Sequence, residues 1–262
     1  MKEPKPLLTA DRSVKTAGQN ASEEVFVLIA YRIKFEKGDD VKFISHLDVM
    51  RYFQRAIKRA GLPIGYSQGF NPHQLMSFAS PLTLGTTSEG EYGDFEFKEV
   101  LPAREIKDRL NEVMPVGFKV ANVVRLKEKT LNSMAAVDAA SYTVTFNKGI
   151  TDEMLKDGLK GYIKQEEILV VKKTKKSCKE VNIREDILTL NDISANGKAS
   201  LYMLLSAGSR RNLKPESVVE SLCNYFNVPY ERFMVSYNRV DMYRRNEKDE
   251  IVSLDSGVGI DE

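Results

Sequence analysis

The sequence predicts an α+β protein that contains two tandem ferredoxin-like domains, each with the element order β-α-β-β-α-β. One observation is a repeat, because "YRIKFEKG" (Tyr31 to Gly38) returns as "YTVTFNKG" (Tyr142 to Gly149). A second is a pair of predicted helices with Pro102 and Pro215 in their first turns, where proline is favoured. The prolines are separated by nearly as many residues as the tyrosines, which indicates one unit that occurs twice.

Hydrophobic periodicity orders the elements within each copy. Alternation at every second residue predicts strands, and a 3.6-residue period predicts helices. The first copy reads strand 27–36, helix 46–60, strand material 64–79 with a short strand at 64–66 and then a turn, strand 91–98, helix 102–114 and strand 117–126. The second copy reads strand 141–147, helix 152–164, strand 167–174, strand 199–206, helix 215–226 and strand 233–243. Each copy would form a four-stranded antiparallel sheet with two helices on one face.

Charge divides the chain into four segments. Residues 1–24 carry equal numbers of cationic and anionic side chains and are predicted to be disordered. Residues 25–130 and 131–245 are the two predicted domains, which are together net basic. Residues 246–262 hold one lysine and six carboxylates, which predicts an acidic disordered tail. Such a tail either keeps the protein soluble or restrains non-specific binding.

Composition excludes several classes of protein. No apolar run approaches the roughly 18 residues of a membrane span, and the N-terminus lacks the apolar block of a signal peptide, so we expect a cytoplasmic protein that does not bind membranes. Cys178 and Cys223 show no metal-ligand spacing and are interpreted as buried, reduced thiols. Two histidines without a cluster of carboxylates argue against a metal site. We therefore expect no metal and no cofactor.

"SHLDVMRYFQRAIKRAG" predicts an amphipathic helix with a basic stripe. Ser45 and Asp48 form a start of the capping-box type. One face is apolar, and the opposite face carries four cations, namely Arg51, Arg55, Lys58 and Arg59. No interleaved carboxylate neutralises these cations, which favours a stripe that faces phosphates over a simply solvated helix face.

His46 lies at the predicted N-terminus of this helix. The helix dipole disfavours protonation of the imidazole there, and free backbone N–H groups attract anions. A neutral imidazole in this position could act as a general base. The alternative is a histidine that only packs or forms a hydrogen bond.

"IGYSQGFNPHQLMSF" contains a loop with the composition of a ligand-binding turn. Gly69 would admit a positive φ and bring backbone N–H groups close to a ligand. Gln68, Asn71 and His73 supply hydrogen-bonding groups, and Phe70 could stack on a base. The alternative is a wide β-turn in which Phe70 plugs the core.

The second copy offers two weaker basic segments. "SAGSRRNLKP" leads from a strand into a helix, and Gly208, Arg210 and Arg211 beside that helix start form a candidate anion site or a plain linker. "VVKKTKKSCK" at residues 170–179 would make only non-specific contacts with an anion.

Several motifs carry a family resemblance. "KFISHLDVMRYFQRAIKRAGLPIGYSQGFNPHQLMSFASPLTLG" with "SEGEYGDFEF" closely resembles the radical-SAM-linked protein family, a domain of unknown function fused to, or encoded beside, a radical SAM enzyme. "LPAREIKDRLNEVMPVGFKV" continues the resemblance, and "GSRRNLKP" and "YNRVDMYRRN" extend it more loosely into the second copy. The resemblance implies an accessory or substrate-handling domain with a separate radical SAM enzyme as partner. The three-cysteine cluster motif of that enzyme is absent from this sequence.

These observations lead to one expected function and two alternatives. We expect a non-catalytic, RNA-binding and substrate-presenting accessory protein that works with a separate radical SAM enzyme. In architecture the chain is also similar to the RNA-processing proteins of CRISPR systems, so one alternative is a metal-independent endoribonuclease with His46 as base. The other is a protein–protein adaptor without nucleic acid. The predicted RNA-binding residues are Lys42, His46, Arg51, Arg55, Lys58, Arg59, Gln68, Gly69, Phe70, Asn71, His73, Arg210 and Arg211.

Overall fold

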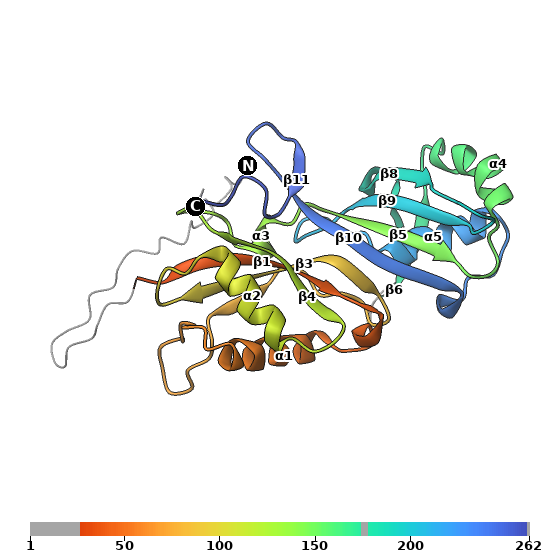
Figure 1. Ribbon diagram of the computed structural model, residues 1–262. Coiled ribbons are helices and arrows are strands. Elements are labelled where there is room, and N and C mark those ends of the chain that lie inside the picture. Colours follow the sequence, from red (N-terminus) through yellow and green to blue (C-terminus); the bar gives the residue numbers. More distant parts are fainter. Residues whose placement is uncertain (1–26, 174–177, 261–262) are drawn as a thin grey trace, which may run out of the picture.

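The protein is a mixed α+β molecule with five α-helices and a large, mostly antiparallel sheet of nine strands (Figure 1). The structure is a computed structural model that describes residues 27–173 and 178–260. The predicted α+β class is confirmed. The predicted disordered segment 1–24 lies outside the described residues.

Residues 29–125 form the first half of the sheet. In chain order the elements are β1 (Ile29–Lys37), the 3-10 helix η1 (Asp39–Val41), α1 (His46–Arg59), β2 (Met76–Phe78), β3 (Thr87–Phe97), α2 (Ala103–Val113) and β4 (Phe118–Arg125). The strands lie in the order β4-β1-β3-β2, and neighbouring strands are antiparallel.

The strand material predicted over residues 64–79 is confirmed only in part. Only Met76–Phe78 forms a strand, and two isolated bridges join Ile64 to Phe97 and Tyr66 to Gln74. Four residues that weaken or interrupt a strand ladder lie in this segment or next to it, namely Pro63, Gly65, Gly69 and Pro72.

The helices α1 and α2 bury one face of this half. Tyr31, Ile33 and Phe35 of β1 belong to one buried cluster with Phe53 of α1, and the Phe35 and Phe53 ring centroids lie 4.7 Å apart. Successive side chains of a strand alternate between its two faces. Arg32 therefore points to the face opposite α1.

Residues 133–245 form the second half. In chain order the elements are α3 (Ser133–Ala136), β5 (Ala139–Phe146), α4 (Asp152–Ile163), β6 (Leu169–Lys173), β7 (Cys178–Asn182), η2 (Arg184–Asp186), β8 (Ile187–Asp192), β9 (Ser200–Ser206), α5 (Pro215–Tyr225), η3 (Arg232–Met234) and β10 (Val235–Arg245). The strand order is β10-β5-β9-β8, again antiparallel throughout. A second buried cluster contains Leu155 of α4, Leu222 of α5 and Met203 of β9.

The prediction that strand 167–174 joins the main sheet is wrong. Residues 169–173 form β6, which pairs with β7 in a separate two-stranded sheet. β8 occupies the edge of the main sheet instead, because Ile187 and Leu190 reach the second core cluster. The exposed Leu169 and Val171 of β6 make no comparable contribution to the core.

The two halves join where β3 meets β10. These strands are parallel, with Thr87 opposite Asn238 and Ser88 opposite Arg239. Gly90 permits the close approach, since a Cβ atom there would lie 2.6 Å from the Cα of Asp241. One continuous sheet results, and its two helical layers belong to different core clusters.

Buried charges cross this junction. The Asp241 carboxylate accepts hydrogen bonds from Lys34 at 2.9 Å, from the Tyr92 hydroxyl at 2.6 Å and from Ser253. Arg239 lies 2.9 Å from Glu91 and donates to the carbonyl of Ser80 at 3.2 Å. Burial raises the pKa of the Tyr92 phenol, so it stays a hydrogen-bond donor to Asp241.

The predicted disordered tail from residue 246 is wrong for residues 246–260. β11 (Ile251–Ser253) pairs with the end of β10, and Leu254 and Val258 are buried. Of the carboxylates that suggested disorder, Asp249 pairs with Arg245 and Asp255 accepts a hydrogen bond from Asn122. Local charge therefore does not keep this segment unfolded.

The structure also bears on the expected absence of membrane-spanning helices and on the exposure of the two cysteines. No helix within the described residues has the length and apolarity needed to cross a membrane. Cys223 is buried as predicted, whereas Cys178 is exposed on β7, because that hairpin is outside the core.

We expect Asp94→Ala to lower the free energy of unfolding by about 3 to 5 kcal/mol, because it leaves a buried guanidinium without its counterion. Arg32 is fully buried, and its Nε and Nη2 atoms lie 2.8 and 3.0 Å from the Asp94 oxygens. Urea denaturation measures the loss. Asp108→Ala is the control, since Asp108 forms an exposed pair with Arg104 and should change stability by less than about 1 kcal/mol. Equal effects of the two variants would contradict the proposed role of the buried pair.

Candidate functional site

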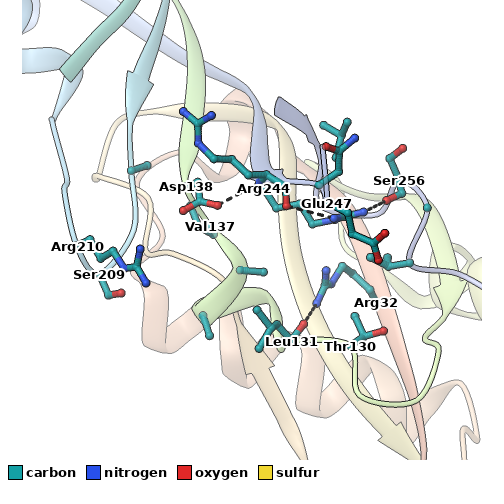
Figure 2. Close-up of a pocket in the computed structure, with 18 of the residues that line it drawn as sticks. Arg32, Thr130, Leu131, Val137, Asp138, Ser209, Arg210, Arg244, Glu247 and Ser256 are labelled. Carbon is teal, nitrogen blue, oxygen red and sulfur yellow. Dashed lines mark hydrogen bonds between the residues drawn. The ribbon is translucent and has the colours of Figure 1, made fainter. Parts of the chain in front are cut away.

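A cleft of about 1320 Å³ lies between the two halves (Figure 2). Three chain segments form its walls: residues 127–138, which connect the halves; residues 206–211, which follow β9; and the end of β10 with the C-terminal segment up to residue 258. Figure 2 shows Arg210 on one side of the cleft, with Arg32 and Thr130 on the other.

Cationic side chains outnumber carboxylates in this cleft. The cations are Arg32, Lys127, Lys129, Arg210, Arg211, Arg244, Arg245 and Lys248, and the carboxylates are Glu128, Asp138, Glu185 and Glu247. A concave surface with an excess of one charge concentrates the electric field. The cleft therefore attracts anions.

Arg244 and Arg245 are oriented by the C-terminal segment. Arg244 donates from Nη2 to the carbonyl of Ser256 at 2.5 Å, while its Nε is buried without a partner in the part of the chain that the structure describes. Arg245 lies 3.1 Å from the Asp249 carboxylate. The fold thus places both guanidinium groups at the cleft before any ligand binds.

The loop after β9 carries the two arginines predicted as an anion site. Arg211 pairs with Glu185 at 3.1 Å and with Asp186 at 3.2 Å, and the hydrogen bond that Arg211 donates to Glu185 raises the pKa of Arg211. Arg210 has no side-chain partner among the described residues. The structure places both arginines in the cleft, and Arg210 is the one free to bind a ligand.

Arg32 stabilises the wall of the cleft and is not available to bind an anion. Besides Asp94, it donates to the carbonyl of Leu254 at 2.7 Å and to that of Leu131 at 2.8 Å. Asp94 also accepts from the backbone N–H of Ser133 at 2.6 Å. Arg32 thereby joins the sheet, the connecting segment and the C-terminal segment.

The predicted basic stripe lies on α1, away from the cleft. No carboxylate is interleaved among the four cations, but Asp48, which precedes them, is 3.0 Å from Arg51, three residues along the helix, so the stripe is partly neutralised. Hydrogen bonds from Ser45 first, and then from Arg51, lower the pKa of Asp48. Arg55 lies over the ring of Tyr52, and Arg59 donates to the carbonyl of Val113 at the end of α2.

Lys58 belongs to α1, and Lys42 precedes that helix in the chain. Neither residue lines the cleft. Lys42 pairs with Asp39 at 2.8 Å. Lys58 is exposed. Their assignment to RNA binding stays a prediction, as does that of the arginines of α1.

The loop at residues 67–73 is exposed and internally braced. The backbone N–H of Ser67 bonds to the carbonyl of His73 at 2.9 Å, and the Ser67 hydroxyl lies 2.8 Å from the His73 Nδ1. Gly69 has a φ of 119°, as expected, with open space where a Cβ atom would be. Phe70 is fully exposed, so the alternative that it plugs the core is wrong. Gln68 and Asn71 are also exposed.

Both histidines of the chain lie outside the cleft. His46 is the first residue of α1, after the Ser45 cap, and its ring meets the edge of Phe78 at 5.9 Å. His73 lies in the braced loop. Residues 27–173 and 178–260 contain no group of three or more histidine, cysteine, aspartate or glutamate side chains that could hold a metal ion.

Comparison with known proteins assigns the chain to a family. Residues 30–215 match the family model described as an uncharacterised protein conserved in bacteria, DUF2344. The chain belongs to this family. No curated protein matches it.

One solved structure is similar to this DUF2344 protein only remotely. A crystal structure of an unknown protein from Galdieria sulphuraria has 11% sequence identity, and the match covers 82% of this chain and 99% of that one, with a TM-score of 0.25. A TM-score of that size assigns neither fold nor function.

Sequence reasoning missed most of the cleft of this DUF2344 protein. Lys127 and Lys129 lie between the two repeated units, where no periodicity draws attention to them. Arg244 and Arg245 follow a strand pattern and precede an acidic run, which suggested a boundary between domain and tail. Adjacent basic residues at the end of a predicted strand were the one available signal.

We expect Gly208→Ala to destabilise the protein by roughly 1 to 3 kcal/mol or more, since it combines a strained backbone with a steric clash. Gly208 has a φ of 116°, and a Cβ atom would lie 2.1 Å from the carbonyl oxygen of Val137. Thermal unfolding measures the effect. Gly197→Ala is the matched control, because Gly197 also has a positive φ but open space around it. If both variants lose the same free energy of unfolding, the clash between residue 208 and the carbonyl of Val137 does not contribute to the loss.

We expect Phe70→Ala to leave the free energy of unfolding within about 0.5 kcal/mol of the wild type, since the ring is fully exposed. Phe53→Ala, in the first core cluster, should cost about 3 to 5 kcal/mol. Denaturant titrations of both variants check this. A large loss for Phe70→Ala would show that the loop is structural.

Proposed function

We propose that this DUF2344 protein is a non-catalytic RNA-binding protein that holds RNA in the cleft and presents it to a separate radical SAM enzyme. The observation that carries the proposal is the excess of cations in the cleft. Phosphate groups are the anions that Lys and Arg contact in nucleic-acid complexes, and such contacts supply most of the non-specific affinity.

The size and layout of the cleft favour a chain of phosphates over a small anion. Pockets for small molecules usually measure about 300 to 1,000 Å³ and converge on a few polar groups. This cleft is larger, and its available cations come from three separate segments. Lys129, Arg210 and Lys248 have no side-chain partner among the described residues. A polyanion can engage them at the same time.

The strand order supports a tandem ferredoxin-like organisation, which we include in the proposal. In each half the fourth strand pairs with the first, the first with the third, and the third with the second. Two helices pack on each half. Four-stranded sheets of this kind bind single-stranded RNA in several protein families.

The partner enzyme is proposed on the resemblance alone. The Ser-His-Leu-Asp motif begins α1, and Ser-Gln-Gly-Phe-Asn-Pro-His forms the braced loop. Gln74, at the end of that loop, donates to the carbonyl of Gln54 on α1 at 3.3 Å, so the two motifs share one side of the molecule. A protein partner on this side would leave the cleft open to RNA.

The endoribonuclease alternative has weaker support. General base catalysis requires a base within hydrogen-bond reach of the proton it removes. Neither His46 nor His73 lines the cleft. A nuclease would therefore have to bind its RNA along α1.

We expect the triple variant Lys129→Ala, Arg210→Ala and Lys248→Ala to weaken RNA binding and flatten its salt dependence. The slope of log K against log salt should fall by roughly 0.7 for each lost phosphate contact on a single strand. Fluorescence anisotropy with a labelled 20-nucleotide RNA at several salt concentrations measures both quantities.

Two control variants decide whether RNA binds in the cleft or along α1. Arg104→Ala removes an exposed cation of α2 and should bind RNA as the wild type does. The triple variant Arg51→Ala, Arg55→Ala and Arg59→Ala tests the stripe on α1. A flattened slope only in this second triple would move the RNA site to α1 and overturn the proposal.

A further inference from the structure

The second half of the sheet has a face that no core cluster covers. On β9, Leu201, Met203 and Leu205 are fully buried beneath the helices. Their neighbours on the other face of the strand are partly exposed, namely Ser200, Tyr202, Leu204 and Ser206. On β5, Thr143 and Thr145 are likewise partly exposed. We call this surface the open face.

A row of hydrogen-bonding side chains crosses the open face around Tyr202. Asn191 of β8 and Thr143 of β5 are the register partners of Tyr202, and Asn238 of β10 is the partner of Thr143. Paired residues in adjacent strands point to the same face of the sheet. The Asn238 amide already bonds to Thr87 and Glu89, so the groups beside the Tyr202 ring that can bond to the edge of a base are the Asn191 amide and the Thr143 hydroxyl.

A second tyrosine lies between this row and the cleft. The Tyr243 hydroxyl is 3.0 Å from the Ser141 hydroxyl. Burial is the main cause that raises the pKa of Tyr243, and Tyr202 is close enough to add to it. Tyr243 is the register partner of Ala139 and Tyr202 that of Thr143, and Ala139, Ser141 and Thr143 alternate onto one face of β5, so both rings lie on the open face.

The open face runs directly into the cleft. Tyr243 is followed by Arg244 and Arg245, which line the cleft, and Ser206 at the end of β9 lines it as well. Tyr202 precedes Ser206 by four residues along β9. A chain whose phosphates lie in the cleft can therefore place its next nucleotides over the two rings.

We infer that the RNA held by the cleft is single-stranded and that its bases stack on Tyr202 and Tyr243. The inference rests on the proposed function. Aromatic rings stack on bases only when the base faces are free, as in single-stranded RNA, whereas a duplex hides them. The rings supply stacking and the cleft supplies charge, which is the combination found in single-strand binding proteins.

The test compares two RNAs and two kinds of substitution. Anisotropy is measured with a labelled 12-nucleotide RNA and with the duplex of the same sequence. Tyr202→Ala and Tyr243→Ala should each weaken binding of the single strand by roughly 5- to 150-fold, the range that corresponds to about 1 to 3 kcal/mol for each stacked base. Tyr202→Phe and Tyr243→Phe keep the rings and should bind within about twofold of the wild type.

The salt dependence separates this inference from the proposed function. The alanine variants should keep the wild-type salt slope, because they lose no phosphate contact, whereas the cleft variants should flatten it. Melting temperatures show which variants fold. If Tyr202→Ala does not fold, Tyr202→Leu replaces it, since leucine covers the sheet without an aromatic ring.

Each outcome is decisive. Wild-type affinity in the folded tyrosine variants, while the cleft variants still lose binding, overturns the stacking inference and leaves the proposed function standing. Equal affinity for duplex and single strand also overturns it. Absence of binding to either RNA by the wild-type protein overturns both.

Discussion

One buried ion pair joins the sheet of the first half to two of the three segments that form the cleft walls. Arg32 of β1 and Asp94 of β3 pair between adjacent strands. Arg32 also donates to the carbonyls of Leu131 in the connecting segment and Leu254 in the C-terminal segment, and Asp94 accepts from the backbone N–H of Ser133. A buried charge is costly unless it is paired and fully hydrogen-bonded. The segments therefore pack in the one arrangement that satisfies both groups, and this arrangement leaves the cleft open beside them.

The same physical constraint sorts the basic residues of this protein into two classes. Arg32, Arg239 and Lys37 are buried, and each is bound to carboxylates or backbone carbonyls; Lys37 donates to the carbonyls of Lys42 and Ile44, and burial lowers its pKa. These residues stabilise the fold. Lys129, Arg210 and Lys248 lie on the cleft and have no such partners within residues 27–173 and 178–260. Only the second class can exchange water for phosphate without breaking the structure.

The molecule has two distinct surfaces with the chemistry of recognition. The alternation along β1 places α1 behind one face of the first half, while Arg32 and the cleft belong to the other. The braced loop with Phe70 and the basic helix share the first side, and the cleft continues into the tyrosines of the open face on the second half. Because the two surfaces are separate, the RNA and the protein partner that we propose would not compete for one site.

The sequence by itself determined the long helices and the nature of the braced loop. Repeats, alternation and helical periodicity located all four long helices, and the glycine in Ser-Gln-Gly-Phe-Asn-Pro-His indicated the positive φ at Gly69. These features are local, since a few neighbouring residues specify each one. Arg210 and Arg211 were also recognised, because glycine and paired arginines before a helix form a local pattern.

Only the tertiary structure decided how the units are joined and where the cations meet. The contact of β3 with β10 links residues 150 positions apart, and it depends on the missing Cβ of Gly90 and on the Asp241 network. The acidic C-terminal segment folds because Leu254 and Val258 find apolar cover in the core and at the cleft wall. Such contacts have no periodicity in the sequence, since they arise from chain segments that meet only after folding. The cleft is therefore a property of the assembled sheet, whereas each long helix is a property of its own residues.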